Sequence, residues 1–233
     1  LFIINYFFRK KEILLDNPNI SSHKSTFTEG IPLSGGTFLL ILLTYYFFKY
    51  NNLFDLTFLF MLLIFFIVGI TSDLNKDFSA NLRFLIQVLL TIFFVHIFDL
   101  QINSVDWNFF DLFLSNKIFN FFFVFFCIIT FLNGLNFIDG SNGLVSGYLL
   151  LISATSLSII FYKLGPVNEN LYDLNVVLLL IYSIFFIFNF FGRCFFGDNG
   201  IYISAILIAY FVISLINFNQ DILSPIFAVM LLW

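Results

Sequence analysis

Long apolar runs recur along the chain, and short clusters of polar and helix-breaking residues separate them. A helix that crosses a hydrocarbon core of about 30 Å needs about 20 mostly apolar residues. The pattern therefore predicts an all-α, polytopic membrane bundle that forms a single domain over residues 1–233. The predicted spans lie near residues 33–50, 53–71, 82–100, 117–135, 141–162, 174–192 and 200–217, and an eighth begins near 222.

Both ends of the sequence fall within or beside apolar segments. The chain opens on Leu1 rather than a methionine and stops at Trp233 inside the eighth apolar run. We interpret the sequence as a fragment truncated at both ends, in which Leu1 to Phe8 is the tail of an earlier span.

Composition supports the membrane interpretation. Hydrophobic residues make up 61% of the chain and charged residues 10%, which leaves too little polar surface to cover a soluble globule of 233 residues. The net charge of −4 predicts no nucleic-acid partner. Cys127 and Cys194 show no metal-ligand spacing, and we expect free thiols.

The distribution of basic residues predicts which side of the membrane each loop faces. Because consecutive spans alternate direction, the segments before residue 33 and at 72–81, 136–140 and 193–199 share one face. Seven of the ten Lys and Arg residues lie on or beside this face, which makes it cytoplasmic by the positive-inside rule. The seven are Arg9, Lys10, Lys11, Lys24, Lys76, Arg83 and Arg193, against Lys49, Lys117 and Lys163.

The segment after the fourth span carries the most specific polar pattern. Asn133, Asn136 and Asp139 are spaced three residues apart between apolar segments, so a helix would bring them to one side. Polar groups at membrane depth are costly unless they serve a ligand, an ion or a partner helix. Gly140 and Gly143 follow and allow the chain to turn back. The alternative is a structural network that joins two helices.

Two further acids fall on the same face. Asp73 ends the second span, and Asp198 lies between glycines at the start of the seventh. A helix N-terminus favours phosphate, and Mg²⁺ binds one or two carboxylates together with phosphate oxygens. The acids and the nearby Arg83 thus predict a metal and diphosphate site, whereas a solvated Asp73 and an ordinary N-cap Asp198 are the alternatives.

These motifs resemble those of the polyprenyl-phosphate N-acetylhexosamine-1-phosphate transferases, glycosyltransferase family 4. The similarity covers most of the chain and follows the order of the family's cytoplasmic signatures. The matching segments are Ile31-Pro32-x-x-Gly35-Gly36, the Asp73 loop with Ser79 to Gln87, Asn133-x-x-Asn136-x-x-Asp139-Gly140-x-Asn142-Gly143-Leu144, and Phe195-Phe196-Gly197-Asp198-x-Gly200. The resemblance implies that about eight helices of a roughly 10–11-helix bundle are visible.

The resemblance also implies an activity and its cofactor. Polyprenyl phosphate, such as undecaprenyl phosphate, would attack the β-phosphate of a UDP-sugar in the bacterial inner membrane, with the active site on the cytoplasmic face. UMP would leave, and a lipid diphosphosugar for cell-wall or lipopolysaccharide biogenesis would remain. Mg²⁺, or Mn²⁺ in its place, would stabilise the charge on the departing phosphate. The resemblance does not decide whether the protein forms a homodimer.

Site roles carry over by position from the family. Asp198 would bind the metal, and Asp73 would lie near the acceptor phosphate and the metal; with Asp139 they form the expected catalytic acids. The substrate-binding residues would be Asn133, Asn136, Gly140, Asn142, Phe195, Arg83 and Arg193, with Phe195 stacking on the uracil.

The sequence departs from the family's pattern at three places. Ser72 replaces the first acid of the usual pair, which weakens a general-base role there. Leu33 stands where many members have arginine, and the late His- or Arg-rich loop would lie beyond Trp233.

Four other functions compete with this interpretation. A phospho-N-acetylmuramoyl-pentapeptide transferase belongs to the same family, and Ser72 keeps a catalytically silent relative open. A transporter would place its acids near mid-span rather than at span ends. A CDP-alcohol phosphotransferase would continue its Asp-Gly motif differently from Asp139-Gly140-Ser-Asn.

Overall fold

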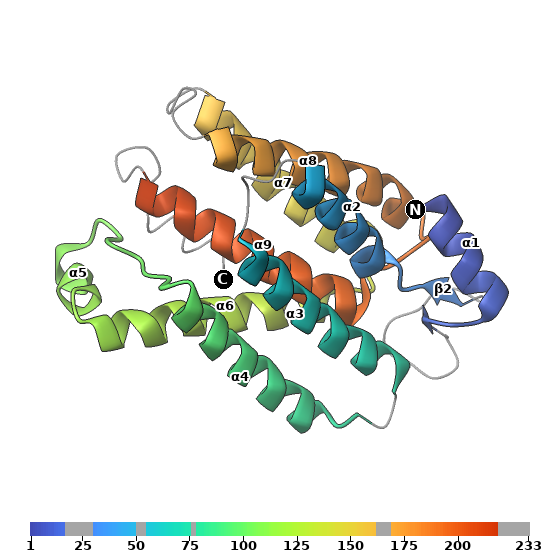
Figure 1. Ribbon diagram of the computed structural model, residues 1–233, viewed down its shortest axis with the longest axis horizontal. Helices are drawn as coiled ribbons and strands as arrows, with labels where there is room; N and C mark the ends of the chain where they lie inside the picture. Colours follow the sequence, from blue (N-terminus) through green and yellow to red (C-terminus); the bar gives the residue numbers. More distant parts are fainter. Residues whose placement is uncertain (17–29, 50–54, 76–77, 162–168, 219–233) are drawn as a thin grey trace.

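The computed structural model describes residues 1–16, 30–49, 55–75, 78–161 and 169–218, and the fold within these ranges is almost entirely helical (Figure 1). The strands β1 (Leu15–Asp16) and β2 (Ile31–Pro32) pair antiparallel in one small hairpin. The described helices are α1 (Phe2–Lys11), α2 (Gly35–Lys49), α3 (Leu56–Leu74), α4 (Ala80–Ile97), α5 (Asn108–Leu114), α6 (Lys117–Ile138), α7 (Leu144–Ile159), α8 (Glu169–Phe190) and α9 (Gly197–Phe218).

The prediction of an all-α polytopic membrane protein is confirmed. Five of the described helices, α3, α4, α6, α8 and α9, are long and apolar enough to cross a membrane. The other two apolar helices, α2 and α7, have 15 and 16 residues and fall at predicted spans as well. Each of the seven complete predicted spans therefore corresponds to a helix, whereas the eighth, near residue 222, lies outside the described residues.

Two helices run further than the hydropathy pattern predicts. Helix α3 continues to Leu74 and α6 to Ile138, although the apolar runs end near residues 71 and 135. No proline interrupts either end, and Ser72 and Asp73 at the end of α3 bond to the start of α9. Ser72, Asp73 and Asn136 thus belong to helix ends rather than to loops.

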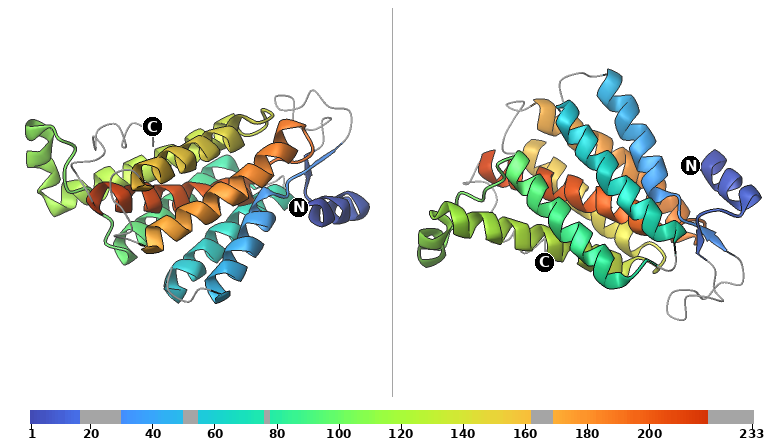
Figure 2. Two further views of the ribbon diagram at one scale, coloured as in Figure 1. Left: turned by 90° about the horizontal axis from the view of Figure 1, so that it is seen from above. Right: turned by 60° about the horizontal axis from the view of Figure 1, so that its bottom comes forward.

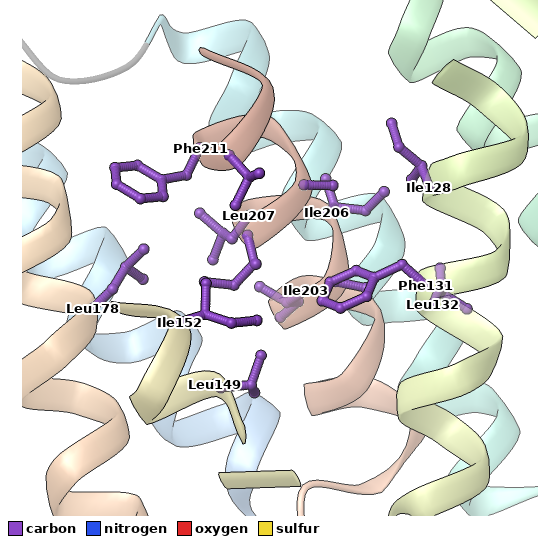
Figure 3. Packing of buried hydrophobic residues seen from close by; sticks show 14 of the residues in the cluster. Ile128, Phe131, Leu132, Leu149, Ile152, Leu178, Ile203, Ile206, Leu207 and Phe211 are labelled. Atoms are coloured by element: carbon purple, nitrogen blue, oxygen red, sulfur yellow. The ribbon is translucent and has the colours of Figure 1, made fainter. Parts of the chain in front are cut away.

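Helix α9 forms the centre of the bundle. Figure 3 shows its apolar side chains between those of α6, α7 and α8. Tight packing of this kind supplies most of the attraction between helices in lipid, which is itself apolar. The packing therefore holds α9 in place, and the neighbouring helices are positioned against its first turn. Its buried residues include Ile203, Ile206, Leu207 and Phe211, which meet Ile128, Phe131, Leu132, Leu149, Ile152 and Leu178.

Glycines let two neighbouring helices approach the first turn of α9 closely. A Cβ added to Gly36 of α2 would lie 2.5 Å from the backbone carbonyl carbon of Asn199. A Cβ on Gly69 of α3 would lie 2.4 Å from the Asn199 Cα atom. Small residues at such crossings are typical of membrane bundles because they let backbones touch. This close approach brings the end of α3 to the start of α9.

The two ends of the bundle carry different elements. Helix α1 and the β hairpin lie at one end, whereas α5 projects at the other (Figures 1 and 2). Asn217, near the last residue of α9, accepts a hydrogen bond from the backbone N–H of Asn103. The 22 residues of α9 span about 33 Å, which is close to the thickness of a bilayer core.

Candidate active site at the start of helix α9

Four segments that are far apart in the sequence meet at the N-terminus of α9. The backbone N–H of Gly197 donates to Asp139 at the end of α6, at 3.0 Å. The backbone of Phe195 pairs with the segment that precedes α2, through its N–H to Pro32 at 2.9 Å and its carbonyl to Gly35 at 3.2 Å. Asp73, at the end of α3, completes the group. The segments predicted to share one face thus meet at one end of the bundle.

Asp73 caps α9 from another helix. Its Oδ1 accepts the backbone N–H of Asp198 at 2.9 Å, and its Oδ2 accepts that of Asn199 at 3.0 Å. The side-chain amide of Asn199 donates to the same Oδ2. The first N–H groups of a helix have no partner within the helix, and a carboxylate there is stabilised by the helix dipole. Asp73 and Asp139 together therefore occupy the N–H groups that sequence reasoning assigned to a phosphate.

Gly197 makes this arrangement possible. Its φ of +69° lies in the left-handed region, and a Cβ there would lie 2.9 Å from the Asp73 Oδ2 atom. Only glycine satisfies both conditions, so the glycine before Asp198 is required by the turn into α9.

Asp198 is held through one of its two carboxylate oxygens. Its Oδ2 accepts from the Ser72 hydroxyl at 2.5 Å, from the Arg83 guanidinium at 2.8 Å and from the Tyr202 hydroxyl at 3.3 Å. Arg83 also donates to the Ser72 hydroxyl at 3.3 Å. Among the described residues no hydrogen bond goes to Oδ1, so that oxygen is available for a ligand.

The ion pair between Arg83 and Asp198 is partly open to solvent. The Arg83 side chain is 32% exposed and that of Asp198 is 12% exposed. A ligand can reach the pair, yet the carboxylate is shielded enough for its charge to act strongly. Within the described residues, no three His, Cys, Asp or Glu side chains are close enough to hold a metal ion alone.

The residues predicted to line the nucleotide-sugar site are only partly gathered here. Asn133 and Asn136 lie half-buried on α6, and Asp139 directly follows that helix. The Asn133 amide donates to the Ile129 carbonyl of its own helix at 2.8 Å. Gly140 turns the chain with a φ of +107°, and Asn142 is exposed. Their substrate contacts stay predictions.

Phe195 and Arg193 lie in different surroundings. Phe195 is only 1% exposed, so stacking on a base would require movement of the groups that cover it. Arg193 is exposed and lies over the Phe191 ring, at 6.0 Å from its centroid. Of the two predicted basic contacts, the structure therefore brings Arg83, not Arg193, to the carboxylate of Asp198.

Sequence reasoning missed three residues that organise the site. Tyr202 lies in an apolar run and resembles a core aromatic, and Asn199 had no assigned role. Asn189, 1% exposed, accepts from the Gly143 N–H at 3.0 Å and donates to the Cys194 carbonyl at 2.8 Å. Asn189 therefore ties the turn before α7 to the turn before α9. The only sequence signal for these residues is their position within or next to the glycine-rich motifs.

Cys194 has a structural environment. It is fully buried, and burial raises the pKa of its thiol to about 12. Asn5 of α1 and Ser34 also reach this thiol, and the Ser34 hydroxyl donates to the Asn5 side chain. The predicted free thiol is confirmed for both cysteines, and Cys194 contributes packing beneath the site rather than reactivity.

Fold and site together define a multi-pass membrane protein with a cluster of acids and one arginine at a single end of its bundle. The sequence model of Glycosyl transferase family 4 matches residues 55–216, which is more than half of the chain. The chain therefore belongs to glycosyl transferase family 4, and its activity is of the sugar-1-phosphate transferase kind. No curated protein matches the chain significantly.

The family match bears on the competing functions. It covers α3 through most of α9, and therefore Ser72, Asp73, Asp139 and Asp198. Membership disfavours the transporter and the CDP-alcohol phosphotransferase, which belong to other families. It leaves the donor sugar open.

Proposed function

We propose that the protein transfers N-acetylhexosamine-1-phosphate from a UDP-sugar to undecaprenyl phosphate, or another polyprenyl phosphate, with release of UMP. The reaction would take place on the cytoplasmic face of a bacterial inner membrane. The observation that supports this most directly is Asp198, whose Oδ2 is fixed by Arg83, Ser72 and Tyr202 while Oδ1 stays available. A positioned carboxylate beside a guanidinium is the arrangement that a diphosphate with a cation requires.

The described residues fit a Mg²⁺ ion that the substrate helps to bind. Mg²⁺ takes one or two carboxylates and completes its shell with water and phosphate oxygens, so a full protein cage is not expected. Asp198 would hold the ion through Oδ1. Asp73 is the weaker candidate because the α9 backbone and Asn199 already donate to both of its oxygens. When bound, Mg²⁺ or Mn²⁺ supplies positive charge to the phosphates.

The chain's own residues then place the reacting groups. The Arg83 guanidinium, 32% exposed, can turn a further N–H toward a phosphate oxygen while it stays paired with Asp198. An oxygen of the acceptor phosphate would form a bond to the donor's β-phosphorus. The bond from that phosphorus to the bridging oxygen would break, and this oxygen would leave with UMP. No general base is needed because the acceptor phosphate is already ionised, which makes an acid at position 72 dispensable.

The experiment that tests this function measures UMP release. Purified protein in detergent, with Mg²⁺ and undecaprenyl phosphate, is given in turn several UDP-N-acetylhexosamines and the UDP-muramyl-pentapeptide. We expect release from an N-acetylhexosamine donor, its loss with EDTA and its recovery when Mg²⁺ is added back. Release from the muramyl-pentapeptide donor alone would assign the protein to peptidoglycan synthesis. No release from any donor by folded protein would identify a silent relative.

Ser72 offers a sharper test of how Asp198 is held. Ser72→Ala removes the hydroxyl that donates to Oδ2 at 2.5 Å but leaves Arg83 and Tyr202 in place. Loss of one hydrogen bond to a charged group costs about 1.5–3 kcal/mol, so we expect UMP release to fall by roughly 10- to 100-fold.

The matched control for this variant is Thr71→Ala. The Thr71 hydroxyl donates to the Val68 carbonyl of its own helix at 2.8 Å and does not reach Asp198. We expect near-normal UMP release from this variant. Equal losses in both variants would show that the effect comes from the end of α3 in general, not from the bond to Asp198.

A further inference from the structure

The connection between α4 and α6 presents apolar rings at the end of the bundle opposite the acids. Trp107 is 54% exposed, Phe109 61% and Leu112 73%. The rings contact one another across α5 and the start of α6, including Trp107 with Phe110 and Phe113 with Phe119. We name this surface the aromatic cap and define it as Trp107, Phe109, Phe110, Leu112, Phe113 and Phe119.

Hydrogen bonds directed inward hold the cap in one shape. Asp111 accepts from the Ser104 hydroxyl at 2.7 Å and from the Val105 N–H at 2.8 Å, so its charge is turned into the loop. The Asn120 amide donates to the carbonyls of Ile102 and Leu114 at 2.8 and 2.9 Å. The rings are therefore exposed by a well-bonded loop that uses its polar groups internally.

The bundle fixes the cap at the height of the membrane boundary. It lies between the end of α4 at Ile97 and the start of α6 at Lys117, and both helices are membrane spans. Asn217, at the far end of α9 from the acids, binds the same connection through the Gln101 carbonyl at 2.6 Å. Figures 1 and 2 show α5 at the end of the bundle opposite α1.

Two observations identify lipid as the partner of the cap. Beside the cap, Ile118, Phe122 and Phe126 lie at four-residue spacing along α6, and all three are exposed, so the cap adjoins an apolar stripe that faces lipid. Within residues 98–119 the only basic residue is Lys117, and a single lysine makes no basic patch for an acidic protein or an anionic headgroup. Tryptophan and other aromatic residues favour the boundary between headgroups and acyl chains.

We propose that the aromatic cap inserts into the headgroup–acyl boundary of the leaflet opposite the active site. Insertion there fixes the depth of α4 and α6 in the membrane. Arg83 and Asp139 lie at the other ends of these two helices. The cap thereby sets the height of the site relative to the lipid acceptor. The insertion itself is independent of which sugar the enzyme transfers.

Tryptophan fluorescence tests the insertion directly. The chain has two tryptophans, so Trp233→Phe leaves Trp107 as the only emitter. In vesicles of zwitterionic lipid we expect blue-shifted emission, and loss of about half of it when the acyl chains carry bromine near the headgroup. Bromine near the chain ends should quench less, and aqueous iodide hardly at all.

A second variant provides the same measurement if Trp233→Phe fails to fold. In Trp107→Phe, Trp233 is retained, and the emission of this variant is subtracted from the emission of the unaltered chain. The difference is the emission of Trp107, and it is obtained independently of the Trp233→Phe variant. Water-like emission that iodide quenches and brominated lipid does not would overturn the proposal. Protection from iodide that disappears when the vesicles are diluted with lipid would also overturn the proposal. In that case a second copy of the chain, not lipid, would cover Trp107.

Discussion

Asp198→Asn is expected to reduce UMP release by about 10²-fold or more while the protein remains folded, because it removes a charge that the reaction needs and little else. The asparagine carbonyl can still accept the bonds from Ser72 and Arg83 that Oδ2 accepts now. The partly exposed Arg83 keeps access to water when its counter-charge is lost. Turnover and apparent Mg²⁺ affinity should therefore fall together, whereas the thermal midpoint changes little.

A matched control for this substitution lies at the other end of the bundle. Asp106 is exposed, and its φ of +57° suits asparagine equally well. Asp106→Asn makes the same chemical change, and we expect unaltered UMP release and an unaltered thermal midpoint. If Asp198→Asn retained more than about a tenth of the UMP release, the negative charge at position 198 would not be essential for the reaction.

The architecture was accessible from the sequence because hydropathy acts locally. Each of the seven predicted spans needed only its own run of apolar residues, and alternation then placed Asp73, Asp139 and Asp198 at one end. Helix α5 was not predicted because seven residues form no span, and its phenylalanines resemble those of the neighbouring helices.

The roles of the individual acids depend on contacts between distant segments. Asp73 and Asp139 looked equivalent to Asp198 in the sequence, yet the first two accept backbone N–H groups of α9, whereas Asp198 is bound by side chains of α3, α4 and α9 through its Oδ2. That division follows from where α3 and α6 end relative to the first turn of α9. No spacing within a single segment encodes it.

Ser72 has contacts that its place in the family pattern does not reveal. As a missing acid, it weakened the expectation of catalysis. In the structure its hydroxyl donates to Asp198 and accepts from Arg83, so it helps to hold the carboxylate whose Oδ1 stays available. An aspartate there would bring a second negative charge against Asp198, and Arg83 would have to neutralise both.

The close contact of α3 with α9 predicts a large structural effect of Gly69→Ala. The new Cβ would lie 2.4 Å from the Asn199 Cα, 2.6 Å from its nitrogen and 2.7 Å from the Asp198 carbonyl oxygen, all of them backbone atoms that no rotamer change can move. The two helices must separate, and overpacking of this kind typically costs about 1–3 kcal/mol. Asp73, one turn further along α3, would move away from the N–H groups of α9.

Thermal unfolding in detergent and UMP release check this prediction together, and Gly134→Ala is its matched control. Gly134 also lies in a helix, α6, but a Cβ there has no neighbour within 4 Å. Because alanine favours the helix by up to about 1 kcal/mol, this variant should be as stable as the parent or more so. Gly69→Ala should unfold at a lower temperature and lose activity. If the two variants behaved alike, close packing of α3 on the first turn of α9 would not be what holds Asp73 against it, and the site would have to be assembled by the loops instead.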